Sequence, residues 1–308
     1  MRLTDSCATL CVALLLTGCA GAGGSVAPAP LPNASQRVVD AGNGRTISFA
    51  VMADAAAKAD VVFFGEQHDD DETHRAELAL LDAIGQRRKK VVLSLEMFER
   101  DVQAAVSSYL GGALSDSAFR AQSRPWPNYA ADYRPLVELA KARGWPVVAS
   151  NIPRRLASAV SRRGLIALDS MTASDRAFVA RDLLCPKDDT YYTNFLEVMG
   201  AGHGGASGTD ARSTMDRFYE AQCVKDETMA ESIVEARVAA GSGAIVVHFN
   251  GAFHSDFGLG TASRVRRRLP RAKTVVVSAV PTPTPTTADA TGFLDRGQFI
   301  ILALRTKP

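Results

Sequence analysis

A short apolar run that stops at a glycine and turns into reactive side chains constrains this chain most. Residues 61–64 are β-branched or aromatic, which is typical of a buried parallel strand. Gly65 ends the run, and Glu66, Gln67 and His68 follow it directly, ahead of a helical pattern. An open α/β sheet places reactive side chains in this way, at the carboxyl ends of its strands.

Later apolar runs repeat this arrangement and predict the fold. Strands are expected at residues 91–95, 146–150, 244–247, 274–279 and 298–304. Together with the first run they predict an α/β protein, a three-layer sandwich with a mainly parallel sheet and helices on both faces. The stretch between the third and fourth runs is far longer than one crossover helix needs, so an inserted helical lobe is expected at about residues 160–240.

Several polar side chains follow the apolar runs directly and are expected to meet. Neighbouring parallel strands lie about 4.8 Å apart, so side chains at their carboxyl ends share one crevice. The residues expected there are Glu66, His68, Glu96, Arg154, His248 and His254. Alternative roles stay open for some of them: Glu66 or Glu96 as a helix cap, Arg154 as an ion-pair partner for them, and His248 as a core histidine bonded to a carbonyl.

Two chemistries suit this set of side chains. Histidines with carboxylates can hold a divalent metal, for which His68, His248 and His254 are the candidate ligands. Alternatively, Glu66 acts as a general base beside Glu96, with the histidines as proton shuttles and Arg154 as an oxyanion or carboxylate clamp. The sequence has no Gly-x-Ser-x-Gly motif and no glycine-rich phosphate loop. The formal net charge of +2 argues against nucleic acid as a partner.

The amino terminus has the features of a bacterial lipoprotein signal. Residues 1–18 are expected to be removed as a signal peptide, because the apolar stretch is too short to span a bilayer. Residues 16–19, Leu-Thr-Gly-Cys, look like a lipobox, which predicts lipidation of Cys19. Residues 19–44 are expected to form a flexible, lipid-anchored tether and residues 45–308 the α/β domain. We expect the protein to be located in the bacterial cell envelope, at the outer membrane, because residue 20 is Ala and not the Asp that signals retention in the inner membrane. A plain secretory signal is the alternative for residues 1–18.

Two cysteines remain once the signal and the lipid site are set aside. Cys185 and Cys223 would then lie in an oxidising compartment, which favours a disulfide between them. Two unpaired buried thiols are the alternative. Zinc fingers are excluded, since no Cys-x-x-Cys occurs.

Six motifs, in order along residues 54–304, resemble the ChaN family of haem-binding lipoproteins. They are Gly-Glu-Gln-His at 65–68, Leu-Glu-Met-Phe at 95–98, Pro-Trp-Pro-Asn-Tyr at 125–129 with Tyr-Arg-Pro-Leu at 133–136, Asn-Ile-Pro-Arg at 151–154, Asp-Glu-Thr-Met-Ala at 226–230 and His-Phe-Asn-Gly-Ala-Phe-His at 248–254. That family belongs to the superfamily of Tiki metalloproteases, TraB-like proteins and erythromycin esterases.

The resemblance implies a membrane-anchored, haem-binding protein in haem or iron uptake, with a tyrosinate on the iron and a homodimer clasping the haems. Tyr191 and Tyr192 are the first candidate ligands, with His203 assisting, and Tyr129 and Tyr133 are the second. A buried helix face is the alternative for Tyr191 and Tyr192. The other superfamily members imply a metal-dependent or Glu/His-type hydrolase, and a structural lipoprotein with a vestigial site is a third hypothesis.

Overall fold

A single mixed sheet runs through the centre of the protein. The computed structural model describes residues 35–202 and 209–305. The strand order is β2-β1-β8-β7-β3-β6-β4-β5, parallel from β8 to β5 and antiparallel at β1 and β2. The strands are β1 (Gln36–Asp40), β2 (Arg45–Ile47), β3 (Val61–Glu66), β4 (Lys90–Glu99), β5 (Val147–Asn151), β6 (Ala244–Gly251), β7 (Thr274–Thr282) and β8 (Phe299–Leu304).

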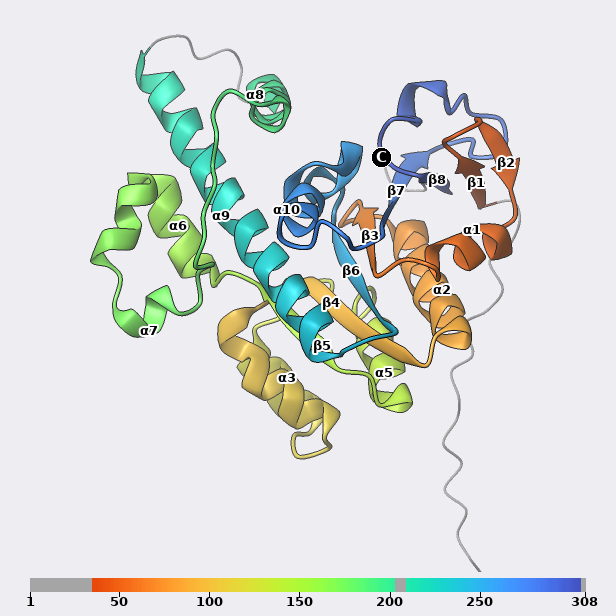
Figure 1. Ribbon diagram of the computed structural model, residues 1–308, viewed down its shortest axis with the longest axis horizontal. Coiled ribbons are helices and arrows are strands. Elements are labelled where there is room, and N and C mark those ends of the chain that lie inside the picture. The colour runs from red at the N-terminus through yellow and green to blue at the C-terminus, as the bar shows by residue number, and fades with distance from the viewer. Residues whose placement is uncertain (1–34, 203–208, 306–308) are drawn as a thin grey trace, which may run out of the picture.

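Helices cover both faces of this sheet, so the predicted three-layer α/β sandwich is confirmed (Figure 1). The helices are α1 (Phe49–Ala56), α2 (Asp71–Arg87), α3 (Gln103–Leu110), α4 (Asp116–Ser123), α5 (Arg134–Arg143), α6 (Arg154–Arg163), α7 (Ala173–Arg176), α8 (Thr190–Gly202), α9 (Thr209–Ala239) and α10 (Gly260–Arg268). Short 3₁₀ helices lie at Arg100–Val102, Leu165–Ser170, Ala252–His254, Asp256–Gly258 and Thr291–Phe293.

The alternation of side chains along the strands explains why the sheet has two cores. Val62 and Phe64 of β3 face a large core made with α1 to α5. Val61 and Phe63 face the opposite side, where Ile233 of α9 and neighbouring apolar residues of α10 pack. A strand buried on both faces has no polar side, which is why the sequence of β3 reads as a continuous apolar run.

The carboxyl ends of the central strands lie next to one another, as the sequence predicted. β6 lies between β3 and β4, and its His248 pairs in register with Phe63 on one side and Ser94 on the other. Glu66, at the end of β3, pairs with Gly251 at the end of β6. The pairing of β4 with β5 slips between Leu95 and Glu99, which gives Glu96 room to leave the regular ladder.

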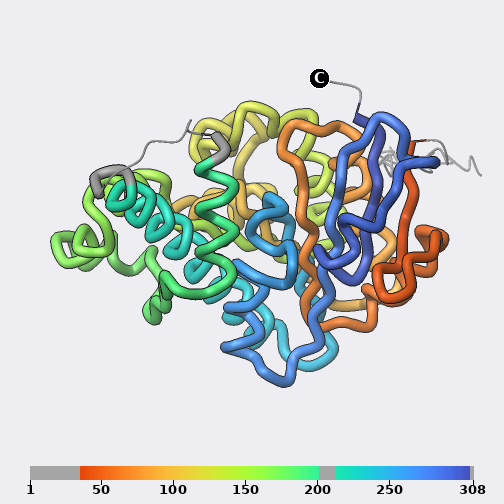
Figure 2. The backbone as a smooth tube through the Cα atoms, turned by 90° about the horizontal axis from the view of Figure 1, so that it is seen from above, coloured from red at the N-terminus to blue at the C-terminus, as the bar shows by residue number. Residues whose placement is uncertain are grey.

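Two predicted boundaries were wrong. Residues 36–40, assigned to the tether, form β1, because Val38 and Val39 are buried against β8 and its neighbours. The helical lobe does not end as a separate unit near residue 240. The last third of α9 lies on the sheet as a covering helix, so the lobe consists of α6 to α8 and the first part of α9 (Figures 1 and 2).

Candidate functional site

Glu66 and His68 form the first pair of the site, directly after β3. The Nδ1 atom of His68 donates to Oε1 of Glu66 at 2.5 Å, and the hydroxyl of Tyr133 donates to the same oxygen at 2.5 Å. Glu66 is buried, whereas 45% of the His68 side chain is exposed. Burial would lower the pKa of His68, but the hydrogen bond and the charge of Glu66 raise it above its ordinary value. His68 is therefore an accessible imidazole held in place by a buried carboxylate.

A second, fully buried group lies behind Glu66. His74 and Glu77, both on α2, hydrogen-bond through Nδ1 and Oε2 at 2.8 Å. Glu66, His74 and Glu77 each offer a ligand atom within 4.8 Å of the others. Burial and the charge of Glu66 raise the pKa of Glu77 well above its ordinary value, whereas the pKa of Glu66, despite its burial, is lowered by its hydrogen bonds and the nearby histidines.

His254 makes the third part of the site, between two carboxylates from different elements. Its Nδ1 atom donates to Oδ1 of Asp226 on α9 at 2.7 Å, and its Nε2 atom lies 3.2 Å from Oε1 of Glu96. Burial would lower the pKa of His254, but the charges of Glu96 and Asp226 raise it to about 10. Both carboxylates have lowered pKa values, since the charge of His254 outweighs their burial. The result is a buried triad that is charged at neutral pH.

The first and third parts meet at Gly251. A Cβ atom added there would lie 2.7 Å from Nε2 of His68 and 3.8 Å from Oε2 of Glu96, and the amide of Gly251 donates to that same oxygen at 2.8 Å. Only glycine lets the imidazole of His68 lie against this strand end. The structure thus brings together Glu66, His68, Glu96 and His254, four of the residues that the sequence placed in one crevice.

Two predicted members of that crevice lie elsewhere. Arg154, the first residue of α6, is exposed and forms no ion pair within the described residues, so it neither clamps nor neutralises Glu66 or Glu96. The side chain of His248 is fully buried against the ring of Phe63, and its Nδ1 atom hydrogen-bonds the Ser94 hydroxyl at 2.9 Å. Burial lowers the pKa of His248 to about 4, so this histidine is neutral. It therefore fits the alternative role of a core histidine, except that it bonds a hydroxyl and not a backbone carbonyl.

The side chains that cluster as a metal site would require differ from the predicted ligands, which stay a prediction. Within residues 35–202 and 209–305, the group able to hold a metal is Glu66, His74 and Glu77, rather than His68, His248 and His254. His74 and Glu77 were not among the predicted ligands because both lie inside a helix and follow no strand directly. Their spacing of three residues puts both side chains on one face of α2, and this spacing is the signal that was available.

Tyr191 and Tyr192 are buried in the lobe, with 3% of each residue exposed. The Tyr191 hydroxyl donates to Oδ2 of Asp226 at 2.7 Å, and the Tyr192 hydroxyl donates to Asp216. Burial raises the pKa of both phenols, and their carboxylate partners add to this. Their role as haem ligands stays a prediction, although the helix-face alternative describes their packing. His203 and Cys19 lie outside the described residues.

All the tyrosines of the chain share this burial. The sequence has six, and each is at most 3% exposed. Two hydroxyls besides those of Tyr191 and Tyr192 also donate to carboxylates: that of Tyr109 to Glu138 and that of Tyr133 to Glu66. Of the histidines in the described chain, His68 alone is exposed, the others being at most 6% exposed. The accessible metal-binding side chain at this edge is an imidazole.

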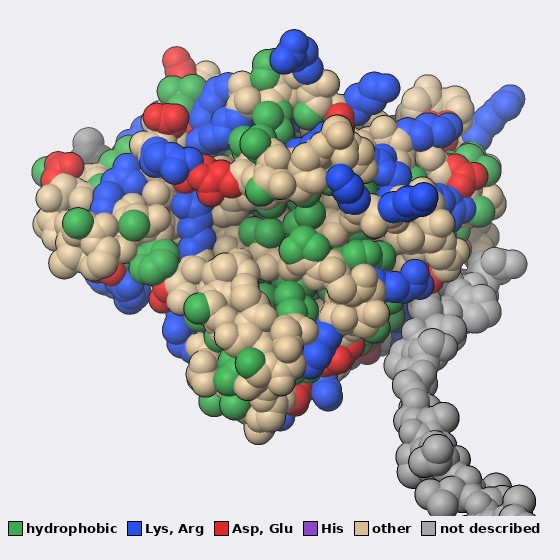
Figure 3. Space-filling view, turned by 60° about the horizontal axis from the view of Figure 1, so that its bottom comes forward, with side chains coloured by type: hydrophobic (Ala, Val, Ile, Leu, Met, Phe, Trp, Pro, Cys, Tyr) green, Lys and Arg blue, Asp and Glu red, His purple; other side chains and the backbone are tan. Residues whose placement is uncertain are grey.

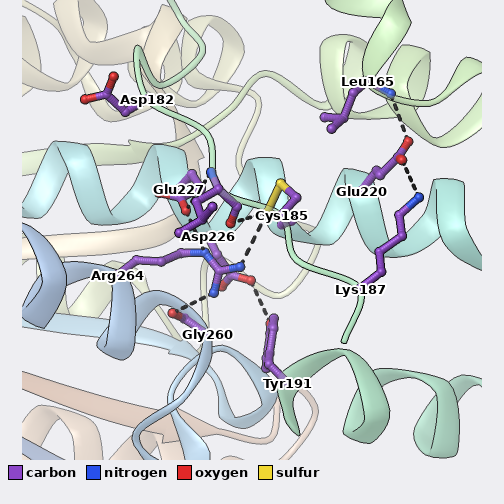
Figure 4. Close-up of a disulfide and its surroundings, with 12 residues drawn as sticks. Leu165, Asp182, Cys185, Lys187, Tyr191, Glu220, Asp226, Glu227, Gly260 and Arg264 are labelled. Atoms are coloured by element: carbon purple, nitrogen blue, oxygen red, sulfur yellow. Dashed lines mark hydrogen bonds and ion pairs between the residues drawn. A yellow bond between two sulfur atoms is a disulfide. The ribbon is translucent and has the colours of Figure 1, made fainter. Parts of the chain in front are cut away.

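The predicted disulfide is confirmed. Cys185 and Cys223 are bonded, with their Cα atoms 5.7 Å apart, and the bridge ties the segment before α8 to α9 (Figure 4). A guanidinium nitrogen of Arg264 lies 3.4 Å from Sγ of Cys223, and the guanidinium lies over the ring of Tyr191. Since Tyr191 bonds Asp226, the bridge supports the same carboxylate that holds His254.

A model of a protein family described as "Haem-binding uptake, Tiki superfamily, ChaN" matches residues 52–265 of the chain. The chain belongs to this family. The ChaN-family match spans β3 to α10 and therefore every residue of the site, including Asp226 and His254.

Two individual proteins resemble this ChaN-family member. The structure described as "Cofacial heme binding to ChaN of Campylobacter jejuni" superposes with a TM-score of 0.66 and 16% identity, over 90% of this chain and all of that one. Protein RETICULATA-RELATED 5, chloroplastic, from Arabidopsis thaliana is 22% identical over 199 residues. That match covers 61% of this chain, which spans about a quarter of the length of the Arabidopsis protein. The Campylobacter structure shows that the fold is shared.

Within the described part of the chain, no helix combines the length and the apolar character needed to cross a membrane. The face shown in Figure 3 carries many Lys and Arg side chains among hydrophobic ones, and no histidine of the described chain is visible on it.

Proposed function

We propose that this ChaN-family protein binds haem at the carboxyl edge of its sheet and acts in haem or iron uptake. The haem-binding character of its family and the haem-bound state of the Campylobacter ChaN structure support this proposal. One observation carries it: His68 is an exposed imidazole at the mouth of the site, and a buried Glu66 orients it.

His68 fits haem iron better than any tyrosine of the chain. A tyrosinate ligand requires an ionised phenol, whereas burial and nearby carboxylates raise the pKa of Tyr191 and Tyr133 above its ordinary value. Imidazole is a common axial ligand of haem iron. The hydrogen bond from Nδ1 to Glu66 fixes the tautomer of His68 and leaves Nε2 as the unprotonated nitrogen, as carboxylates behind metal-bound histidines do. Because Nε2 lies against Gly251 in this structure, the imidazole has to move away from that strand end to bind iron. Haem, when bound, supplies the iron centre that this imidazole would hold.

Titration with hemin tests the proposal. Wild-type protein is expected to produce a shifted Soret band with saturable stoichiometry, and His68→Ala is expected to weaken binding at least tenfold. The double variant Tyr191→Phe/Tyr192→Phe keeps the packed rings and removes both hydroxyls, so it should bind like the wild type. If the tyrosine variant loses hemin binding and His68→Ala does not, a tyrosine and not His68 is the iron ligand. If the wild type does not bind hemin, the proposed function is refuted.

We also propose that the chain is held at the bacterial envelope through lipidated Cys19 and binds haem as a homodimer. The lipobox in residues 16–19 supports the anchor, and the cofacial haem binding of Campylobacter ChaN supports pairing of two haems between two copies. Cys19→Ser should release the protein from the membrane fraction. Sedimentation velocity with and without hemin should show a dimer when hemin is bound. A monomer at all ratios of haem to protein would contradict the proposed homodimer.

A Glu/His-type hydrolase is the second candidate, and the geometry of Glu66 and His68 favours it. A carboxylate hydrogen-bonded to an accessible histidine is a general-base arrangement, and the hydrogen bond and charge of Glu66 raise the pKa of His68 above its ordinary value. The charged His254 nearby could stabilise a developing anion. Hydrolysis of a panel of activated esters and peptides, abolished by Glu66→Gln with hemin absent, would support an enzyme. If the wild type hydrolyses none of these substrates faster than Glu66→Gln does, the hydrolase hypothesis is refuted.

A further inference from the structure

A basic surface cavity opens beside His68 and has no role in the site described so far. It has a volume of about 790 Å³ and lies between the loop after α4 and the start of α6. It is lined by Glu99, Asp101, Arg124, Pro125, Trp126, Pro127, Arg154, Arg155, Ser158 and Arg162.

The charges in this cavity do not cancel. Arg124 forms ion pairs with Glu99 at 3.0 Å and Asp101 at 2.6 Å, which uses both acids of the lining. Arg155 pairs with Asp175 at 2.7 Å. Arg154 and Arg162 are exposed, and the described residues give neither of them an ion-pair partner. They lie eight residues apart on α6 with Ser158 midway, so all three share one face of the helix.

Trp126 joins this cavity to the site. Its ring is half-buried and contacts the imidazole of His68 edge-on, with 4.7 Å between the ring centroids. Tyr133, which bonds Glu66, packs on the same indole at 5.8 Å. Two prolines flank Trp126 and restrict the backbone on both sides. The cavity therefore offers a flat, stiff aromatic wall next to the accessible imidazole, and two arginines without an acidic partner across from it.

We propose that this cavity binds the carboxylate-bearing edge of the porphyrin, with Trp126 against the macrocycle and Arg154 and Arg162 paired with the propionates. The inference rests on the proposed function and adds the residues that orient the ligand. Guanidinium groups suit carboxylates because their fork of N–H donors matches the two oxygens. An aromatic ring suits a porphyrin because both are flat and apolar on their faces.

The probe for this step is protoporphyrin IX, which carries both propionates and no iron. The chain has two tryptophans, so Trp145→Phe leaves Trp126 as the sole indole reporter. In that background, protoporphyrin IX should quench Trp126 fluorescence, and Arg154→Ala and Arg162→Ala should each weaken binding about three- to tenfold. Arg163→Ala is the matched control, since Arg163 neighbours Arg162 on α6 but bonds Ser170 and lies outside the cavity.

Two further probes separate failure of this step from failure of haem binding. The dimethyl ester of protoporphyrin IX lacks the carboxylate charges, so it should bind more weakly to the Trp145→Phe protein and lose nothing more in Arg154→Ala. Hemin should give the same Soret position in Arg154→Ala as in the wild type, because the axial ligand is unchanged. Equal binding of acid and ester, or a loss in Arg163→Ala as large as in Arg162→Ala, overturns the cavity assignment while hemin binding to the wild type stands. No hemin binding at all overturns the proposed function itself.

Discussion

The positive charge of His254 should make the stability of the folded chain fall as the pH rises. His254 lies between Glu96 and Asp226, and their charges raise its pKa to about 10, against about 6.5 for an unfolded histidine. A pKa raised by folding contributes stability that is complete below pH 6.5 and is lost as the pH rises through 10. Between these values the folded state holds one more proton, so each pH unit costs about 1.4 kcal/mol in the free energy of unfolding. From pH 7.5 to 9.5 the loss is about 2–3 kcal/mol.

Urea unfolding at pH 7.5, 8.5 and 9.5 measures this slope directly. His254→Gln should be less stable than the wild type at pH 7.5, because Glu96 and Asp226 lose their cation, but its stability should fall less steeply by about 1.4 kcal/mol per pH unit. His248→Gln is the control: His248 is equally buried in the same part of the sheet, but its pKa of about 4 keeps it neutral throughout this range. It should keep the wild-type slope. Equal slopes in the wild type and His254→Gln would refute the charged triad.

Three further perturbations test other parts of the structure. Burial lowers the pKa of His248 to about 4, so the folded state resists protonation of this side chain. The free energy of unfolding should therefore fall by up to about 3 kcal/mol as the pH drops from 6.5 to 4. Urea titrations in acid would detect this loss, and His248→Gln should remove it. Replacing Cys185 and Cys223 by serine opens a bridge with a sequence separation of 38, so the free energy of unfolding should fall by about 4 kcal/mol. Reductant should destabilise the wild type by a similar amount, and an unchanged denaturation midpoint would contradict the prediction. Gly251→Ala places a methyl group against His68, at a cost of about 1–3 kcal/mol of strain. This strain should displace the imidazole and weaken hemin binding. An unaltered His68 signal in a proton NMR titration would contradict the prediction, because it would show that the ring has room.

The strand ends were predictable because each central strand is buried on both faces. A strand such as β3 must be apolar throughout, so the first polar residues after it mark the edge of the sheet. That logic located Glu66 and Glu96 correctly from residue order alone. It misplaced His248 because this histidine pairs with Phe63 and Ser94, at a level of the sheet that precedes Glu66 and Glu96. A neutral imidazole bonded to Ser94 is compatible with a buried strand, and sequence gives no sign of such a partner.

The groups contributed by helices were not predictable in the same way. Asp226 holds His254 from the middle of α9, and His74 and Glu77 stand behind Glu66 from α2. A helix carries no marker of which turn will pass the sheet edge, because that depends on how the helix crosses the strands. The structure supplies the reason: a fully buried acid such as Asp226 must be paired, and a histidine is a natural partner.

Because α9 is one long helix, it fixes the directions in which side chains point toward three parts of the protein: the lobe, the site and the sheet. The helix has 31 residues, so it extends about 46 Å. Along it Cys223 anchors the lobe, Asp226 serves the site, and Ile233 packs on the sheet. Each residue inserted into a helix turns everything beyond it by about 100°. Extra residues ahead of Cys223 would leave these three directions unchanged, whereas one placed between Cys223 and Ile233 would point at least one of them the wrong way. The lobe is thus free to vary in size at its outer end only.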